Sequence, residues 1–359
     1  MQDLLFELIQ VAIRRKTCLS HTPTANEWET MYRMAESQAI LGICFVGVKQ
    51  TKEIQTGIPK PLFMQWLAMA AKIQQRNEEM DKKTAEVWAL LNKAGLDCAV
   101  LKGQGVAELY GSTNETLGIL RQSGDIDVWV KGGFDVVSDF VQKTQPTKDI
   151  AYHRFHYNMY ADTEVELHHR PTLMRNLFDD RRLQRWCDSF GADSFVMTDK
   201  GFAVPSLEFN RIFILTHIYR HFLFEGIGLR QLMDYYFCLR NKELTTEDRD
   251  YNKTLLNHFG LYRFAGAVMH VLAEVYGLEG KYMICPPNKK EGEYLLKQTL
   301  IGGNFGRYDN RVKNNKDDSS IARKLFMNLR YALHYPGELL WAPIWRVYAA
   351  YWKMTNRIN

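Results

Sequence analysis

The chain has 359 residues, of which 46% are hydrophobic and 24% are charged, and this is the composition of a globular protein long enough for two or three domains. Its 46 lysines and arginines outnumber its 41 aspartates and glutamates, so the net charge is +5; this small excess suits a phosphate-bearing ligand without demanding nucleic acid. The six cysteines form no Cys-x-x-Cys pair, which argues against a structural zinc site or a disulfide scaffold and favours a reducing compartment.

The first ten residues predict an amphipathic helix rather than a secretory signal, because Asp3 and Glu7 interrupt the apolar run and no basic leader precedes it. The sequence has no run of about 18 apolar residues. We therefore expect no membrane-spanning helix and a cytoplasmic protein.

Residues 1–95 have a helical pattern. Thr24 and Glu27 form a capping-box signature before a periodic segment. Pro61 is placed to open a second, long helix, and Gly95 is placed to end it.

The pattern changes after Gly95 to short apolar runs separated by turns. Strands are expected at 98–101, 126–130, 151–160 and 164–169, and helices at 106–110 and 133–143. We expect a glycine turn at 102–105 and a polar loop at 112–124. Residues from 206 onward are helical again, and 303–320 predict a loop.

These patterns predict an α+β protein in three parts. A helical region occupies residues 1–95, a domain with a mixed sheet and helices occupies 96–204, and a helical domain occupies 205–359.

The most informative motif is the pair Asp125 and Asp127. Successive side chains of a strand alternate between faces, so the two carboxylates share one face while Ile126 and Val128 share the other. Two crowded acids suit a hard cation such as Mg²⁺ or Mn²⁺. An isolated Asp-x-Asp triplet is more often a loop, a helix cap or a solvated strand edge.

A third acid distinguishes these interpretations. Glu164, Glu166 and His168 share one face of the later strand. If that strand lies beside the Asp125–Asp127 strand, Glu166 completes a cluster of three acids, which can hold two divalent ions roughly 3.5–4 Å apart. Such a cluster supports phosphoryl-group transfer by positioning and electrostatics.

The glycine turn Lys102-Gly103-Gln104-Gly105 lies between a strand and a helix. Backbone N–H groups there can face a phosphate, and Lys102 can supply a positive charge. The turn is not a P-loop, because the Gly-x-x-x-x-Gly-Lys-Ser/Thr pattern is absent.

Together these motifs resemble the uncharacterised bacterial nucleotidyltransferases of the DNA polymerase beta superfamily. The resemblance is carried by Leu101-Lys102-Gly103, by Arg121 with Gly124-Asp125-Ile126-Asp127-Val128, by Val165-Glu166-Leu167-His168, and by the helical segments His217–His221 and Gly228–Asp234. It implies a nucleotidyltransferase-type mixed sheet in which Gly103 forms the turn. It also implies that Asp125, Asp127 and Glu166 are the catalytic metal ligands.

The sequence departs from the superfamily pattern at three points. The turn reads Gly-Gln rather than Gly-Gly or Gly-Ser, the gap from the turn to the acid pair is long, and the third acid is Glu166 rather than aspartate. The nucleotide-binding residues that we expect are Lys102, Gly103, Arg121, Ser123, Gly124, His168 and Arg230.

Several of these residues also have structural interpretations. Arg230 and Asp234 have the spacing of an ion pair on one helix, Arg121 can cap its loop instead of contacting phosphate, and His168 can hydrogen-bond near Glu166. His153 and His156 are expected on opposite strand faces and therefore cannot both line one site. The aromatic segment with Trp341, Trp345 and Trp352 favours a core or dimer helix over membrane-surface docking.

The sequence therefore predicts a metal-dependent transferase that moves a nucleoside monophosphate from an NTP such as ATP to an acceptor hydroxyl and releases pyrophosphate. The acceptor is a small molecule, a protein side chain or an RNA end. One alternative is a degenerate nucleotidyltransferase fold that binds a nucleotide or a partner protein without catalysis. Another is a metal-dependent hydrolase or nuclease, although the absence of a strongly basic patch weighs against a nuclease.

Overall fold

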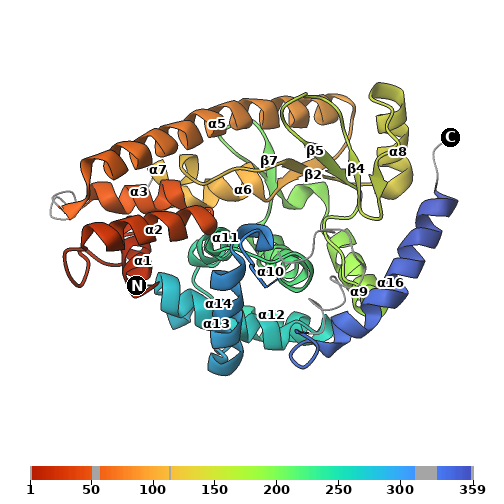
Figure 1. Cartoon of the computed structure of the whole chain (residues 1–359). Coiled ribbons are helices and arrows are strands. Elements are labelled where there is room, and N and C mark those ends of the chain that lie inside the picture. The colour runs from red at the N-terminus through yellow and green to blue at the C-terminus, as the bar shows by residue number, and fades with distance from the viewer. Residues whose placement is uncertain (1, 51–56, 113–114, 312–329, 357–359) are drawn as a thin grey trace.

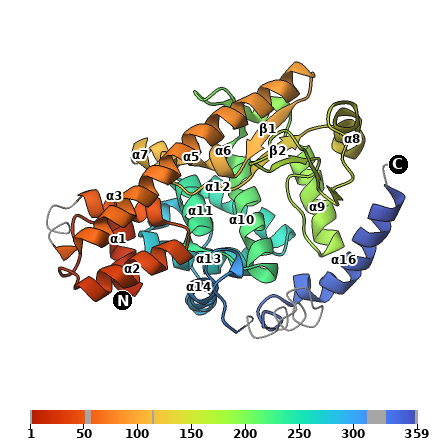
Figure 2. The same cartoon turned by 45° about the horizontal axis from the view of Figure 1, so that its top comes forward.

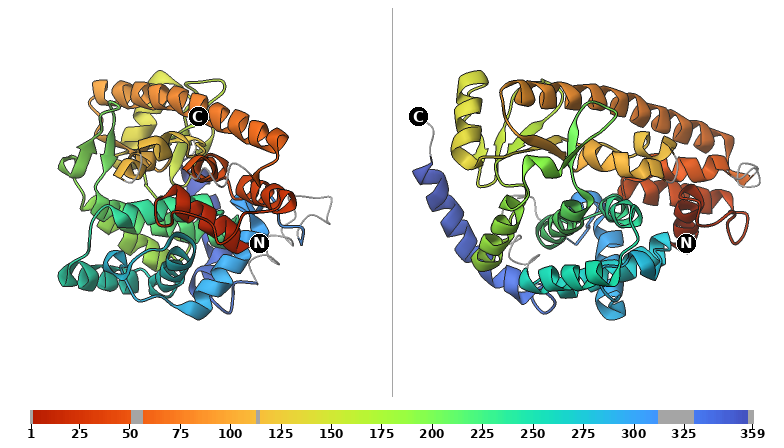
Figure 3. Two further views of the ribbon diagram at one scale, coloured as in Figure 1. Left: turned by 90° about the vertical axis from the view of Figure 1, so that its left-hand side faces the viewer. Right: turned by 180° about the vertical axis from the view of Figure 1, so that it is seen from behind.

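The structure is a computed structural model that describes residues 2–50, 57–112, 115–311 and 330–356. The long helix α5 and the sheet lie on one side of the molecule, and the C-terminal helices α10 to α14 lie on the other (Figure 1). Both views of Figure 3 keep these two layers apart. The protein is a mixed α+β fold, as its sequence predicts.

The N-terminal region is helical. It contains α1 (Gln2–Ala12), α2 (Ala25–Ser37), α3 (Leu41–Gln50) and α5 (Lys60–Lys93). The capping box of Thr24 and Glu27 precedes α2 as predicted. Pro61 lies in the first turn of α5, and Gly95 follows its C-cap with a φ of 77°, a conformation that glycine adopts without strain.

Helix α5 joins the two hydrophobic cores of the protein. Leu62 and Trp66 from its first half belong to the larger core, and Val87 and Leu91 from its second half belong to the smaller core under the sheet. The helix crosses the sheet in Figure 2. It therefore fixes the position of the sheet relative to the N-terminal helices.

The sheet has five strands in the order β1-β2-β5-β4-β3. They are β1 (Cys98–Leu101), β2 (Ile126–Val130), β5 (Val165–His168), β4 (Arg154–His156) and β3 (Ile150–Ala151). The β2–β5 pair is parallel and the other pairs are antiparallel. A separate two-stranded sheet contains β6 (Phe195–Met197) and β7 (Ala203–Pro205).

Three local predictions are corrected by the structure. The expected strand at 151–160 is a hairpin, because the chain folds back at residues 152–153 and pairs β3 with β4. The expected loop at 112–124 contains a helical turn, α7 (Glu115–Ile119). The glycine turn is shorter than expected, because α6 (Gly103–Ala107) already begins at Gly103 and is followed by the 3₁₀ helix η1 (Glu108–Ser112). Helix α8 (Gly133–Thr144) agrees with its prediction.

The C-terminal part is helical. Its helices are α9 (Leu177–Asp188), α10 (Leu207–Phe224), α11 (Leu229–Arg240), α12 (Thr246–His258), α13 (Tyr262–Tyr276), α14 (Lys289–Gly302) and α16 (Pro336–Thr355). The larger core contains residues of α1, α3, α10, α11 and α13. The N- and C-terminal helices therefore share one core, although they are far apart in the sequence.

Helix α16 lies along the edge of the molecule beside α9 (Figure 3). Trp352 stacks on His169 at 5.9 Å between ring centroids and contacts Tyr152 at 5.3 Å, so part of the aromatic segment packs on the sheet domain. Leu340 and Val347 on the other side are 74% and 72% exposed. Of the predicted loop at 303–320, residues 304–306 form a 3₁₀ turn and residues 312–320 lie outside the described part. In the described part of the chain, every helix is too short or too polar to span a membrane.

Candidate active site

The parallel strands β2 and β5 bring the predicted acids together. Asp127 and Glu166 are direct partners in the register of the two strands, so their side chains leave the sheet side by side on one face. Ile126 and Val128 point to the other face, into the smaller core. The hypothesis of a three-acid cluster required the strand of Glu166 to lie beside the strand of Asp127, and β2 and β5 are neighbours in the sheet.

Asp127 is buried and is surrounded by positive and hydrogen-bonding groups. Its Oδ1 atom lies 2.9 Å from the Lys102 Nζ atom and 2.8 Å from the His168 Nε2 atom. Burial alone would raise the pKa of this carboxyl, but Lys102 and His168 outweigh burial and hold the pKa well below its ordinary value. Asp127 is therefore an anion at neutral pH.

Glu166 has a similar environment. Its Oε1 atom forms an ion pair with the Arg154 guanidinium, and its Oε2 atom lies 3.2 Å from the His168 Nε2 atom. Because the His168 Nε2 atom lies close to both carboxylates, it carries the proton and donates it. Burial lowers the pKa of His168, and the hydrogen bond to Asp127 opposes this only in part, so the imidazole is neutral.

The backbone of the glycine turn is strained where it approaches the acids. Lys102 has φ 46° and ψ −148°, a conformation that costs a residue with a Cβ atom of order 1–3 kcal/mol. Gly105, later in the same turn, has no room for a side chain, because a Cβ atom there would lie 2.6 Å from the Val100 carbonyl oxygen. Strain of this kind occurs at functional sites, and the Lys102 ammonium contacts Asp127.

Gln104, the residue that departs from the superfamily pattern, points away from the acids. Its amide donates to the side chain of Asp81 on α5 and lies 3.5 Å from the Asn77 carbonyl oxygen. Only backbone groups and the Lys102 side chain of this turn are therefore directed to the site.

The other residues of the Asp-x-Asp motif lie at the entrance to β2. Asp125 precedes the strand by one residue and, with Gly124, lines the cavity described below, whereas Ser123 is not among the lining residues. Asp125 is thus on the same side as Asp127, as the strand alternation predicts.

Arg121 is engaged in a buried ion pair. Its Nε and Nη2 atoms lie 2.6 Å and 2.7 Å from the two carboxylate oxygens of Asp234 on α11, and the Tyr110 hydroxyl donates to the same carboxylate at 2.7 Å. Burial lowers the pKa of Arg121, but Asp234 more than offsets this and raises it. The predicted ion pair between Arg230 and Asp234 is therefore not formed, because the Asp234 carboxylate binds Arg121 instead.

Arg230 instead reaches the loop before β2. Its Nη1 atom donates to the Gln122 carbonyl oxygen at 2.8 Å, while its Nε atom is buried without a partner. Burial and the neighbouring Arg121 lower the pKa of Arg230 to about 10, so it stays a cation at neutral pH.

These residues surround a cavity of about 560 Å³ between the sheet and the C-terminal helices. The sheet side contributes the predicted acids together with Lys102 and Arg154, whereas α10, its C-cap and α11 contribute basic and aromatic residues and two further acids, Glu225 and Asp234. Among the predicted site residues, Lys102, Gly103, Arg121, Gly124, Asp125, Asp127, Glu166 and Arg230 line it. His168 lies behind Asp127 and Glu166, which it joins by hydrogen bonds.

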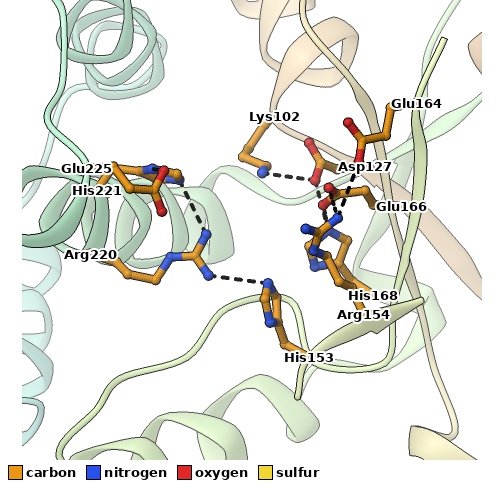
Figure 4. Close-up of polar contacts among 10 residues, drawn as sticks. All are labelled: Lys102, Asp127, His153, Arg154, Glu164, Glu166, His168, Arg220, His221 and Glu225. Atoms are coloured by element: carbon orange, nitrogen blue, oxygen red, sulfur yellow. Dashed lines mark hydrogen bonds and ion pairs between the residues drawn. The ribbon is translucent and has the colours of Figure 1, made fainter. Parts of the chain in front are cut away.

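A chain of polar contacts joins the turn between β3 and β4 to α10 (Figure 4). The Arg220 guanidinium donates to the Nε2 atoms of His153 and His221, each at 3.3 Å. The His221 Nδ1 atom donates to Glu225 at 2.7 Å. Burial raises the pKa of Glu225, but His221 outweighs it and lowers this pKa to about 2. His153 lines the cavity while His156 contacts Glu164 at 3.3 Å, so the two histidines do not share one site, as expected.

The donor set fits a divalent cation. Among the described residues, Asp127, Glu166 and His168 have potential ligand atoms that lie within 4.8 Å of one another, although the His168 Nε2 atom could bind a cation only after losing the proton that it donates to the two carboxylates. The Asp127 Oδ2 atom is buried and has no hydrogen-bond partner, which is costly for a carboxylate oxygen unless a cation or water approaches it. Two carboxylates with one imidazole suit Mn²⁺, and the carboxylates also suit Mg²⁺.

Sequence reasoning missed Arg154, Arg175 and Arg220. Arg154 lies opposite His168 in the register of β4 with β5; the two strands were expected, but their register, which brings Arg154 to Glu166, was not. Arg220 adjoins His221 in a segment that the resemblance already marked. The sequence around Arg175 gives no signal, because the residue precedes α9 and reaches the cavity only through tertiary packing.

Comparison with known proteins gives one result. Residues 24–277 match the family described as an uncharacterised nucleotidyltransferase, and the match includes every residue of the acid cluster and the glycine turn. Neither the curated proteins nor the solved structures gave a match.

Proposed function

Since the chain belongs to the uncharacterised nucleotidyltransferase family, we propose that it transfers a nucleoside monophosphate from an NTP to an acceptor hydroxyl. The observation that carries this proposal is the register of Asp127 with Glu166 in a cavity that also holds basic groups. Paired acids suit metal-assisted phosphoryl chemistry, and arginines and lysine suit phosphates.

The reaction is a displacement at the α-phosphorus of the NTP. The acceptor oxygen forms a bond to this phosphorus, the bond from the phosphorus to the α,β-bridging oxygen breaks, and pyrophosphate leaves. The hydroxyl proton passes to a base, for which we propose Glu166. Bound Mg²⁺ or Mn²⁺ would neutralise the phosphate charge and make the attacking hydroxyl more acidic.

The residues of the chain have separate roles in this proposal. Asp125, Asp127 and Glu166 hold the cations, and His168 orients the two buried carboxylates. Lys102 and Arg154 contact these acids in the structure and become available to phosphate once a cation replaces them. Gly103, Gly124 and Arg230 surround the nucleotide, while Arg121 supports the loop through Asp234.

Two experiments test the metal and the reaction. In the first, Mn²⁺ binding is measured by electron paramagnetic resonance for the wild type, for Asp127→Asn and for Asp139→Asn, an exposed acid on α8 that serves as a matched control. We expect loss of binding only in Asp127→Asn, and equal binding by all three proteins would contradict the metal assignment.

In the second, labelled ATP, CTP, GTP and UTP are incubated with Mg²⁺, the purified protein and a cell extract, and the labelled product is identified. Asp127→Asn should reduce the transfer by more than about 100-fold, because it removes a charge that acts on the transition state. Full activity of this variant would refute the proposal. Tight Mg²⁺-dependent NTP binding without pyrophosphate release would favour the alternative of a binding protein.

A further inference from the structure

Four arginines that line the cavity form no ion pair with a described carboxylate: Arg175, which precedes α9, Arg220 on α10, Arg230 on α11, and Arg307, which follows the 3₁₀ turn at 304–306. Arg230 donates to the loop before β2 and Arg307 is exposed, so Arg175 and Arg220 are the partly buried pair. The basic residues nearer the acids are already neutralised, because each of them contacts a carboxylate directly: Lys102, Arg154 and Arg121. The positive charge on the helical side therefore exceeds what the chain itself neutralises there.

The contacts of Arg220 are all to neutral groups. Its two terminal nitrogens donate to His153 and His221, and its Nε atom is buried without a partner. Burial lowers the pKa of both histidines, so neither carries charge at neutral pH. The nearby carboxylate of Glu225 accepts from His221 instead.

Arg175 is held by an aromatic ring. Its guanidinium carbon lies 3.2 Å from the centroid of the Phe224 ring and 5.4 Å from that of Trp345. Glu338 accepts hydrogen bonds from the backbone N–H group of Arg175, at 2.8 and 2.9 Å, and its carboxylate is not in an ion pair with the guanidinium. The Nη1 atom has no partner. Cation–π contacts orient the group without neutralising it.

Both arginines are partly buried, and a charge that is partly removed from water without a counterion is costly; an anionic ligand removes this cost. Two guanidinium groups match the charge of a phosphate monoester, and each can donate two parallel hydrogen bonds to it. Figure 4 shows Arg220 across the cavity from Lys102, Asp127 and Glu166, with His153 between the two sides. Arg220 is thus apart from the acids at which the reaction is proposed, and the contacts of Arg175 are to Phe224 on α10 and to Trp345 and Glu338 on α16.

The triphosphate has other partners. If cations and an NTP occupied the acid side, as proposed above, Lys102 and Arg154 would be released from Asp127 and Glu166 and could contact the triphosphate, together with Arg230. The charge on Arg175 and Arg220 is then left for the second substrate.

We infer that Arg175 and Arg220 bind a phosphate monoester of the acceptor, so that the hydroxyl that receives the nucleotide belongs to a phosphorylated molecule; this rests on the proposed function. The arginines would hold the phosphate of this molecule on the helical side and leave its hydroxyl directed to the acids. The reaction itself is the displacement described above.

Titration calorimetry with inorganic phosphate tests the inference on the full chain. Without metal, the wild type should bind phosphate, and Arg220→Gln and Arg175→Gln should each weaken binding by about tenfold or more, the value of one charge-assisted hydrogen-bonded contact. Arg185→Gln, an exposed arginine on α9, should bind as the wild type does. Both test variants should have a thermal midpoint at least as high as that of the wild type, because they remove an uncompensated charge.

The titration is then repeated with saturating Mg²⁺ and an ATP analogue that cannot release pyrophosphate. We expect the phosphate affinity to stay within about twofold, since the two ligands occupy different sides of the cavity. Displacement of phosphate by the analogue would overturn the inference and assign the arginines to the triphosphate, as would absence of phosphate binding or an equal loss in Arg185→Gln. Failure of the analogue to bind would refute the proposed function alone, because the first titration needs no nucleotide.

Discussion

Replacing Asp234 by asparagine should destabilise the protein severely, because the change leaves a buried charge without its partner. Arg121 and Asp234 are 4% and 9% exposed at their side chains. The bidentate contact at 2.6 and 2.7 Å joins the loop before β2 to α11. An uncharged amide cannot neutralise the guanidinium, and its NH₂ group would face an Arg121 donor. Breaking a buried pair by removal of one charge costs about 3–5 kcal/mol.

Urea denaturation measures this loss as a change in the free energy of unfolding. The matched control is Asp139→Asn, which breaks an exposed pair with Lys143 in which the side chains are 62% and 72% exposed. An exposed helical pair contributes about 0.3–0.5 kcal/mol, so the control should change stability by no more than that. The urea m-value should stay constant in both variants, because the surface exposed on unfolding is the same.

A double variant distinguishes loss of the ion pair from other effects. Arg121→Met combined with Asp234→Leu replaces both charges by apolar groups and should recover at least half of the loss, although Tyr110 loses an acceptor. A loss below about 1 kcal/mol for Asp234→Asn, or no recovery in the double variant, would refute the reasoning.

Two further predictions concern the fold around the site. Burial raises the pKa of Glu338 to about 7 from its ordinary 4.5, against the opposing hydrogen bonds from the backbone of Arg175 and Asn176. Ionisation of this carboxyl therefore lowers the free energy of unfolding. The loss is absent below about pH 4.5, grows as the pH rises, and is complete above about pH 7. Glu338→Gln should gain stability relative to the wild type between pH 5 and pH 8, by up to about 3 kcal/mol, and a pH-independent difference in urea denaturation would contradict this. Gly105→Ala places a Cβ atom 2.6 Å from the Val100 carbonyl oxygen and should lower the free energy of unfolding by about 1–3 kcal/mol. In the control Gly111→Ala, nothing lies within 4 Å of the new Cβ atom, so stability should change by no more than about 0.5 kcal/mol. Equal effects of the two substitutions would argue against a steric role of Gly105.

Local patterns of the sequence were sufficient for the elements that carry the acids. The alternation in β2 placed Asp125 and Asp127 on one side, and the capping box and Gly95 fixed helix ends, because these features depend on neighbouring residues only. The mixed α+β class followed from the same patterns. The turn at residues 152–153 was missed because aromatic residues favour a strand without showing where it folds back.

What the sequence determined by itself is therefore the chemistry of each element, namely two strands with acids and a glycine turn with a lysine. The tertiary structure decided which of these groups meet. The register of β2 with β5 placed Asp127 opposite Glu166, and the packing of α11 gave Asp234 to Arg121 rather than to Arg230. It also brought Arg175 and Arg220 to the cavity without a carboxylate partner among the described residues. Such long-range pairings depend on packing and charge compensation between distant segments, which no local pattern records.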